Sequence, residues 1–522
     1  MIVSMMKRWL ILPILILHAA LCGAPSTDTT TLYNSLDRCS IAQLFAFYHL
    51  YSDTPQGKRA LSDAWELIQR HRKELAKCCD EDLTLPSMEI DPIITLVNKQ
   101  PFDPPILLNE KQLSLIENIS NHLFNRKLGG FALWNKDDLM TLPSEEVDLA
   151  RALLLYQFED NSFQIRQYEA GIDLISLQIL ARLPLHPSHE EKIRAINHFI
   201  FHEQCFRFPP HSLYAQDIDL YTFLPSVLDK RLGVCLGVSI LYLAIAQRLD
   251  LPLEIVTPPG HIFIRYNMGE HTWNIETTAR GIHLPDRNYL GINTRKLQQR
   301  TLKEVIGLAL MNQAALAWQR GGYQTSIHLY EQALPYLPAD PLIKMFLAYN
   351  YLFADRITEG KKMLREISTI TFDCSVSKEV TPEDFLNDRV NIEGIKVIFA
   401  HVDEHRHSIL DKQKKLQDII KQFPHFRDGL FQLATTHLQM GHEQKAYEVL
   451  LQYHALDPTN PTVEYYLSAI CINRLNYRKA WYHLKQAQML TARRDHHPTC
   501  LKQLHYTLRT LFPDPEDRVH LH

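Results

Sequence analysis

A 34-residue period in the second half of the chain limits its fold more than any other feature of the sequence. Small and apolar residues recur at this spacing in two pairs of segments, which are clearest at residues 307–374 and 427–494. In the second pair, the group Leu433-Ala434, Ala446 and Leu450 returns as Leu467-Ser468, Ala480 and Leu484. A fixed period of this length is typical of helix-turn-helix units that bury their apolar faces only by stacking on one another.

The length of the period and the small residues at the helix crossings are those of tetratricopeptide repeats. We therefore expect a solenoid of such repeats over residues 301–495, with a C-terminal tail at 496–522. The concave face of such a solenoid usually binds a peptide or protein, so we expect a partner of that kind. The alternative is that the helices cover the rest of the molecule and bind nothing. Residues 371–404, between the two repeat pairs, are irregular, and residues 391–422 have a helical pattern.

A second informative stretch, residues 231–281, precedes the repeats and combines a cysteine, a histidine and a glutamate. Gly233 suits the turn before a helix, and the apolar residues after it recur at helical spacing. Cys235 therefore falls in the first turn of the predicted helix. The free N–H groups and the dipole at that end favour a thiolate, which is the nucleophilic form of cysteine.

The helix is followed by Pro258-Pro259-Gly260 and then by two segments rich in β-branched and aromatic residues, at 261–266 and 271–275. With a hairpin turn centred on Met268-Gly269, His261 would lie directly across from Glu276, and Asn274 would be its diagonal neighbour. A carboxylate beside an imidazole fixes its tautomer and stabilises its charged form. We therefore predict Cys235 as nucleophile, His261 as base and Glu276 as the residue that orients His261, with Asn274 in reserve for that last role.

The same stretch resembles the transglutaminase-like superfamily of papain-type cysteine enzymes. Within that superfamily it is similar to a bacterial branch in which tetratricopeptide repeats often follow the core. The resemblance is carried by Phe223–Arg231, Gly233, Cys235, Leu241–Leu249 and Pro259-Gly260-His261, and it extends from about Glu145 to about Leu290.

The resemblance places the nucleophile of the family on Cys235, its base on His261 and its third member on Glu276. The superfamily usually has aspartate at the third position, so the carboxylate here approaches on a longer side chain. The resemblance implies a core of helices with a small antiparallel sheet, and a chemistry that needs no metal or organic cofactor.

The first 24 residues have the pattern of an export signal. Lys7-Arg8 precede an apolar run from Trp9 to Leu17, and Ala19–Ala24 offers small residues for cleavage. The run is too short for an ordinary membrane-spanning helix. We expect a signal peptide or a membrane anchor at residues 1–24 and an exported protein of a bacterial cell envelope or the medium. Membrane contact is expected only through this segment.

Composition excludes some classes of function. The net charge is −4 among 522 residues, which gives no global electrostatic case for binding nucleic acid. The 26 histidines are scattered, and the cysteines follow no spacing typical of zinc sites, so we expect no metal site. Eight cysteines follow the export segment, and an exported chain could pair some of them as disulfides.

Together these patterns predict an α+β protein. A helical region at residues 25–140 would precede the transglutaminase-like core at 141–300, and the all-α solenoid would follow. A thiolate beside a paired histidine and glutamate suits acyl transfer, with hydrolysis of an amide as the first expectation. Two alternatives stay open: an envelope scaffold in which only the repeats act, and an acyltransferase that cross-links amines.

Overall fold

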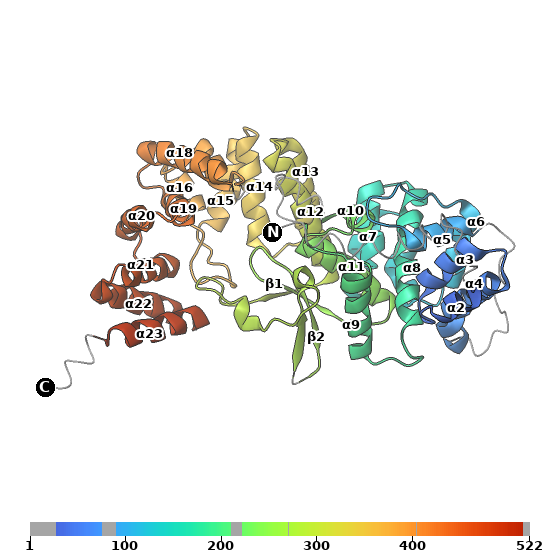
Figure 1. Cartoon of the computed structure of the whole chain (residues 1–522). Helices are drawn as coiled ribbons and strands as arrows, with labels where there is room; N and C mark the ends of the chain where they lie inside the picture. Colours follow the sequence, from blue (N-terminus) through green and yellow to red (C-terminus); the bar gives the residue numbers. More distant parts are fainter. Residues whose placement is uncertain (1–27, 76–89, 210–221, 270, 403–404, 515–522) are drawn as a thin grey trace. The chain divides into compact units, whose positions relative to one another are not determined.

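The computed structural model describes residues 28–75, 90–209, 222–269, 271–402 and 405–514. The predicted export segment at 1–24 lies outside these residues, and none of the helices in the described part of the chain is long and apolar enough to cross a membrane. The chain forms two compact units, coloured along the sequence in Figure 1. One unit comprises Met1–Leu123 with Arg166–Ala195, and the other Phe124–Ile165 with Ile196–His522. This division differs from the boundary predicted at residue 140.

The first unit is helical, as predicted for residues 25–140. Its apolar stripes, such as Ile41, Leu44 and Phe45, are buried in a common core. Charged contacts add to the packing: Arg166 donates to Glu117 at 2.6 Å. The helices are α2 (Thr29–Asn34), α3 (Ile41–Tyr51), α4 (Pro55–Leu75), α5 (Asp91–Asn98), α6 (Glu110–Ile119) and the larger parts of α8 (Ser162–Ala181) and α9 (His189–Asn197).

The core of the second unit joins short helices to a small sheet. Helix α11 (Cys235–Arg248) lies at its centre, and every residue from Leu236 to Ala246 is buried. A helix with no polar face must be enclosed by other elements. Those elements include α7 (Leu149–Phe158), α10 (Leu224–Lys230) and the 3-10 helix η1 (Phe124–Lys127). The 3-10 helices η2 (Gly129–Ala132) and η3 (Lys136–Thr141) pack on α7. The unit also contains the 3-10 helix η4 (Ser144–Glu146) and the π-helix η5 (His198–Glu203).

The sheet is antiparallel and has the strand order β3-β2-β1-β4. Its strands are β1 (Glu254–Thr257), β2 (Phe263–Asn267), β3 (Thr272–Ile275) and β4 (Gln298–Arg300), with η7 (Thr277–Ala279) and η8 (Asp286–Asn288) between the last two. Strand β2 packs against α11. A small antiparallel sheet in a mostly helical chain confirms the predicted α+β class.

The hairpin of β2 and β3 has a different register from the predicted one. Tyr266 pairs with Trp273 and Ile264 with Ile275, so the partners are shifted by two residues. The turn lies one residue further along the chain than predicted, because Met268 N donates to His271 O at 2.8 Å. A shift of two residues keeps every side chain on its predicted face, whereas a shift of one would have reversed them.

Helix pairs with the predicted period follow the sheet. The first two pairs are α12 (Leu302–Gln319) with α13 (Tyr323–Ala333), and α14 (Pro341–Phe353) with α15 (Ile357–Ile367); η9 (Leu334–Tyr336) lies between them. The last two are α19 (Arg427–Gln439) with α20 (Glu443–Leu456), and α21 (Pro461–Asn473) with α22 (Tyr477–Ala492), before α23 (Thr499–Leu511). Helices α19 and α21 begin 34 residues apart, as do α20 and α22.

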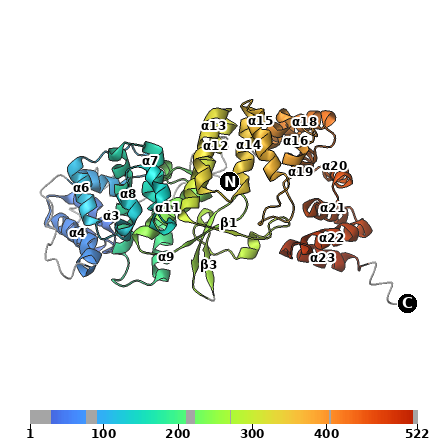
Figure 2. The ribbon, with the colours of Figure 1, turned by 180° about the vertical axis from the view of Figure 1, so that it is seen from behind.

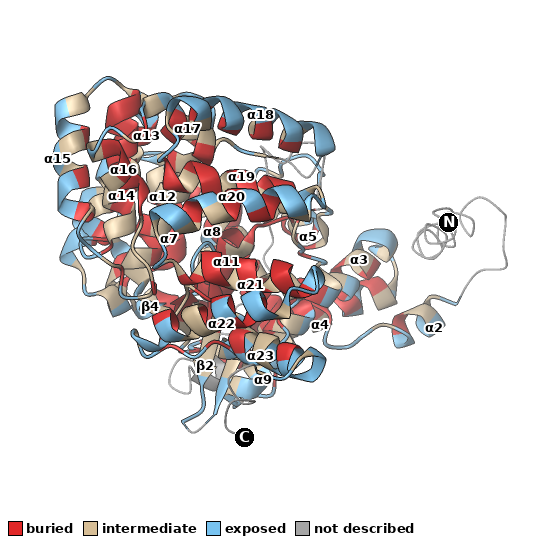
Figure 3. Cartoon of the chain, turned by 90° about the vertical axis from the view of Figure 1, so that its left-hand side faces the viewer, coloured by how far each residue is buried: buried red, intermediate tan, exposed pale blue. Residues whose placement is uncertain are grey.

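The small residues of the repeats lie where two helices of a pair meet. Ser468 Oγ donates to Ala480 O at 2.8 Å, and Ser326 Oγ donates to Ala314 O at 2.9 Å. Because both residues of each bond are almost completely buried, a larger side chain would separate the helices. Figure 3 shows the resulting pattern, in which a helix such as α18 (Arg406–Gln422) is buried along one side and exposed along the other.

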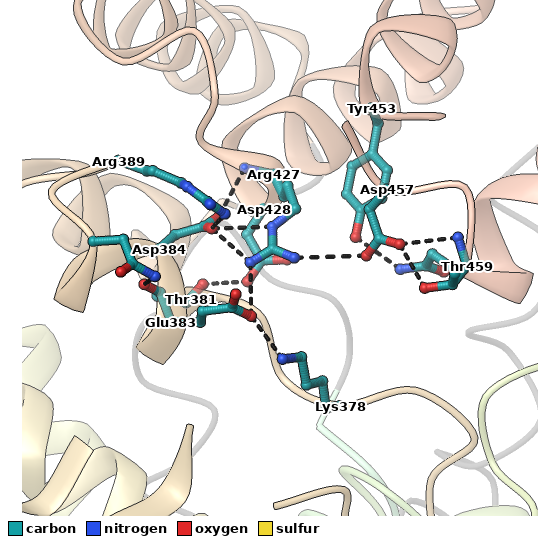
Figure 4. A network of polar contacts seen from close by, with 12 residues as sticks. Lys378, Thr381, Glu383, Asp384, Arg389, Arg427, Asp428, Tyr453, Asp457 and Thr459 are labelled. Atoms are coloured by element: carbon teal, nitrogen blue, oxygen red, sulfur yellow. Dashed lines mark hydrogen bonds and ion pairs between the residues drawn. The ribbon is translucent and has the colours of Figure 1, made fainter. Parts of the chain in front are cut away.

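Three helices occupy the irregular region between the repeat pairs: α16 (Thr381–Leu386), α17 (Ile392–Phe399) and α18. Arg427, the first residue of α19, holds α16 in place. Its side chain donates to Asp384 Oδ1 at 2.7 and 3.0 Å and lies 3.6 Å from Asp457 (Figure 4). Asp384 is completely buried, so this ion pair fixes the insertion to the second repeat array.

Candidate active site

Cys235 is the first residue of α11, as the sequence predicts. The chain reaches it through Gly233, whose N–H donates to Arg207 O at 3.1 Å. A Cβ atom at Gly233 would come within 2.6 Å of the Val238 side chain, so only glycine fits this approach to the helix. The half-buried Cys235 thus lies at a helix end whose first N–H groups lack intrahelical partners.

His261 precedes β2 and is set by a tight turn. Its N–H donates to Pro258 O at 3.1 Å, and Gly260 has φ +70°, a conformation that favours glycine. The imidazole Nε2 donates to Glu276 Oε2 at 2.7 Å. The predicted contact between these two side chains is therefore present. Since Nε2 is engaged by the carboxylate, Nδ1 is the ring nitrogen left for Cys235.

Glu276 is held by more groups than the sequence indicates. Its Oε1 accepts from the Thr278 backbone N at 3.1 Å and from the Thr278 hydroxyl at 2.6 Å. Its Oε2 accepts from the Tyr289 hydroxyl at 2.7 Å as well as from His261. The Tyr289 ring also stacks on Phe263, with centroids 4.4 Å apart. These bonds fix the carboxylate before any substrate binds.

The end of β3 is also tied to the cysteine helix. Thr277 follows Glu276, and its hydroxyl lies 3.1 Å from that of Ser239, with both residues buried. Ser239 is four residues after Cys235, so the two share one face of α11. This bond fixes the strand that carries Glu276 to the helix that carries Cys235.

The charged side chains of the site stabilise one another's ionised forms. Burial disfavours the protonated form of His261, but hydrogen bonds with Cys235 and Glu276 outweigh it and raise the pKa of His261 to about 10. Burial likewise works against the Glu276 carboxylate, yet the hydrogen bonds from His261, Thr278 and Tyr289 lower its pKa. Burial, followed by the bond to Glu276, raises the pKa of Tyr289. The state that results at neutral pH is an imidazolium at His261, which lies between the Glu276 carboxylate and Cys235.

Asn274, the reserve candidate for orienting His261, is engaged elsewhere. Its Oδ1 accepts from Arg265 Nε at 2.9 Å, and its Nδ2 donates to Leu284 O and to Asp286 Oδ1 at 2.7 Å each. None of these bonds joins Asn274 to His261, so a role for Asn274 in orienting His261 stays a prediction. The shifted register places Asn274 directly opposite Arg265.

A cavity of about 340 Å³ opens beside Cys235 and His261. Pro258, Pro259 and Gly260 line it on the side of the sheet. The first repeat helices α12, α13 and α14 line it as well, and both views of the ribbon show α12 and α14 beside β1 (Figures 1 and 2). None of the site residues predicted from the sequence lies in the repeats.

Sequence reasoning also missed Thr278 and Tyr289. A threonine two residues after a glutamate is a local signal, since its backbone N–H and its hydroxyl are both within reach of that carboxylate. Tyr289 has no such signal, because a loop of 12 residues separates it from Glu276 and only the fold brings them together.

One group of side chains in the repeats has the composition of a metal site. Glu464 is completely buried, and its two oxygens accept from His454 Nδ1 at 2.5 Å and from His483 Nδ1 at 2.8 Å. These bonds satisfy the carboxylate without an ion.

The six cysteines in the described residues are free thiols: Cys39, Cys205, Cys235, Cys374, Cys471 and Cys500.

Two comparisons concern the sequence. Residues 166–314 match the family model described as "Transglutaminase-like superfamily". The chain is 32% identical over 111 residues to F-box only protein 21 of Mus musculus, and the aligned part covers 21% of this chain and 16% of that protein. The chain therefore spans about a sixth of the length of this curated relative.

Solved structures of tetratricopeptide proteins are similar to part of this chain. A thermophilic tetratricopeptide protein of Thermus thermophilus is 16% identical, with 39% of this chain and 98% of that chain covered at a TM-score of 0.20. The TPR2AB-domain:pHSP90-complex of yeast Sti1 is 17% identical, with 39% and 85% covered at 0.19. The assignment of the repeats rests on their own helix spacing. Residues 166–314 thus match a transglutaminase-like domain, and tetratricopeptide-like helix pairs begin near the end of this match, at α12, and continue beyond it.

Proposed function

We propose that this protein is a cysteine-dependent acyl-transfer enzyme that hydrolyses an amide. The observation that supports it most is the buried Glu276 carboxylate, which accepts from His261 at 2.7 Å while Thr278 and Tyr289 hold it in place. A carboxylate fixed in this way orients an imidazole for proton transfer. Cys235 at the start of α11 supplies the nucleophile, and the adjacent cavity supplies room for a substrate.

In the proposed first step, the Cys235 sulfur attacks the carbonyl carbon of the substrate. The carbonyl electrons move to oxygen, and the N–H groups at the start of α11 stabilise that charge. His261 then donates a proton to the amide nitrogen as the C–N bond breaks, so an amine leaves and a thioester remains.

In the second step, His261 accepts a proton from a water molecule, which attacks the thioester carbonyl. The acid product leaves as the C–S bond breaks, and the proton taken from water stays on His261, which restores the starting state. Throughout, Glu276 compensates the charge of the imidazolium. An amine in place of water would give the cross-linking reaction instead, so incorporation of a labelled amine separates the two outcomes.

The test measures the reaction of Cys235 with iodoacetamide at neutral pH. We expect Cys235 to react much faster than the exposed Cys39 and Cys205, neither of which has a described hydrogen bond to an imidazole. Changing His261 to Ala should abolish the difference. If Cys235 reacts no faster than those two cysteines in the folded protein, the scaffold alternative replaces the enzyme.

We also propose that the repeats bind a protein or peptide and that the chain is exported to a bacterial cell envelope. The first proposal is supported by the helix pairs, whose stacked faces commonly bind such partners. The second is supported by Lys7-Arg8 and the apolar run that follows. Cell fractionation tests export, and full-length protein found in the cytoplasm would contradict it.

A further inference from the structure

One wall of the cavity at Cys235 comes from the repeats. Helix α12 contributes Leu308, Met311 and Ala315, whose spacing of three, four and seven residues places them on one face of the helix. Helix α14 contributes Leu342 and Phe346, four residues apart, and α13 contributes Tyr330. Side chains of the first two helix pairs therefore reach the nucleophile and the histidine.

These apolar side chains face open space. Leu308, Met311, Leu342 and Phe346 are all only partly buried. Their neighbours on the other side of α12 are packed in the core, and Ile306, for example, is completely buried. Apolar surface that remains in contact with water gains free energy when an apolar group covers it. The wall is thus suited to an apolar group of a ligand.

The charges at the cavity neutralise one another. Arg300 Nη2 lies 2.7 Å from Asp340 Oδ2, and the two side chains are 8% and 7% exposed. His261 is already paired with Glu276. A charged side chain of a ligand would lose its hydration here and find no unpaired counter-charge among the described lining residues, which is unfavourable. The cavity therefore selects against charged side chains.

The volume limits the size of the ligand group. About 340 Å³ lies at the lower end of the range of roughly 300–1,000 Å³ that small-molecule sites span. It accommodates one large side chain with the backbone next to it, rather than a long segment of folded protein.

We infer that the first two repeat pairs build the binding pocket for the acyl side of the substrate, and that the pocket takes an apolar side chain of leucine or phenylalanine size next to the carbonyl that Cys235 attacks. The inference rests on the proposed function and gives that site its substrate class: peptide amides with an apolar residue on the acyl side. The repeats are then part of the active site as well as an arm for binding partners.

The experiment measures how small amides protect Cys235 from iodoacetamide in the full-length protein. The probes are N-acetyl-phenylalanine amide, N-acetyl-leucine amide, N-acetyl-glutamate amide and N-acetyl-lysine amide. Mass spectrometry of the cysteine peptides gives the labelling rate of Cys235 at each concentration, with Cys39 as the internal control. Protection requires binding alone, so the result does not depend on whether Cys235 is unusually reactive or whether the amides are hydrolysed.

We expect the phenylalanine and leucine amides to slow labelling of Cys235 at concentrations at least about tenfold lower than the charged amides, and to leave Cys39 unaffected. Changing Phe346 to Ala should raise the half-protecting concentration of the phenylalanine amide by about tenfold or more, because missing apolar contacts in such pockets change discrimination by about 10- to 200-fold. Leu342→Ala is a second, smaller truncation of the same wall. Phe163→Ala, an exposed position on α8 that does not line the cavity, is the matched control.

Equal protection by charged and apolar amides, or half-protecting concentrations within twofold of the parent in both Phe346→Ala and Leu342→Ala, would overturn the inference. If Cys235 labels no faster than Cys39 but the apolar amides still protect it, the pocket is retained and the proposed enzyme fails. If Cys235 labels rapidly but the apolar amides do not protect it selectively, the proposed enzyme is retained and the inferred pocket fails.

Discussion

Replacing Glu276 by Gln changes the charge of the site with little change in shape. The parent carboxylate is 4% exposed and accepts hydrogen bonds from His261, Thr278 and Tyr289. The amide of Gln keeps one acceptor oxygen but no longer carries the negative charge that stabilises the imidazolium. The variant therefore isolates the electrostatic part of the contact between His261 and Glu276.

The magnitude follows from the kind of hydrogen bond that is lost. A bond to a charged group contributes about 1.5–3 kcal/mol. At about 1.36 kcal/mol for each factor of ten, a transition state that relies on the imidazolium should lose a rate of about 10- to 150-fold. The free energy of unfolding near neutral pH should fall by a similar amount, about 1.5–3 kcal/mol.

The pH dependence of that difference has a definite sign. His261 has its pKa raised from 6.5 to about 10, so its contribution to stability is complete below pH 6.5 and is lost as the pH rises through 10. Glu276 has its pKa lowered from 4.5, so its contribution is present above pH 4.5 and is lost as the pH falls through the lowered value. The difference between parent and Glu276→Gln should therefore be largest between about pH 5 and 6.5 and should decline as the pH rises toward 10.

Two measurements check this reasoning. Urea unfolding of parent and variant from about pH 5 to 10.5 gives the difference in free energy, with Glu66→Gln, an exposed position on α4, as the control. NMR titration of the His261 ring, assigned by comparison with His261→Ala, gives its pKa, which should move from about 10 toward 6.5 in the variant. A stability difference that does not shrink at the alkaline end of this range, or an unchanged His261 pKa, would refute the role assigned to the carboxylate.

Three further outcomes are expected. Tyr289→Phe removes one donor from Glu276 and should slow turnover by about tenfold while leaving the fold intact, as measured by kcat/KM and circular dichroism. Gly233→Ala places a Cβ within 2.6 Å of Val238 and should lower the free energy of unfolding by about 1–3 kcal/mol. Gly171→Ala is the matched control on α8, where a Cβ meets no atom within 4 Å, and it should raise the free energy of unfolding by about 0.5–1 kcal/mol. Arg427→Met leaves Asp384 buried without this partner and should destabilise the repeats by about 3–5 kcal/mol, measured by thermal unfolding and hydrogen exchange of α16 and α19.

Local patterns in the sequence were sufficient to predict several elements of the structure. The start of α11 at Cys235, the turn at Pro258–Gly260 and the 34-residue spacing of the helix pairs depend on residues close to one another in the chain. Local preferences and periodicity determine such features. The face of the hairpin that carries His261 and Glu276 was also predictable, because side-chain direction alternates along a strand and survives a shift of two residues.

Other features of the site depend on the tertiary structure and could not be predicted from the sequence. The register of β2 and β3 depends on the position of the turn, which the sequence does not specify to the residue. The observed register places Asn274 opposite Arg265. Tyr289 reaches Glu276 only because the segment after β3 folds back over the sheet. The cavity wall requires α12 and α14 to pack beside Cys235. Cys235 and Met311 are far apart in the chain but line the same cavity. Such contacts depend on how whole elements pack, so no local pattern in the sequence predicts them.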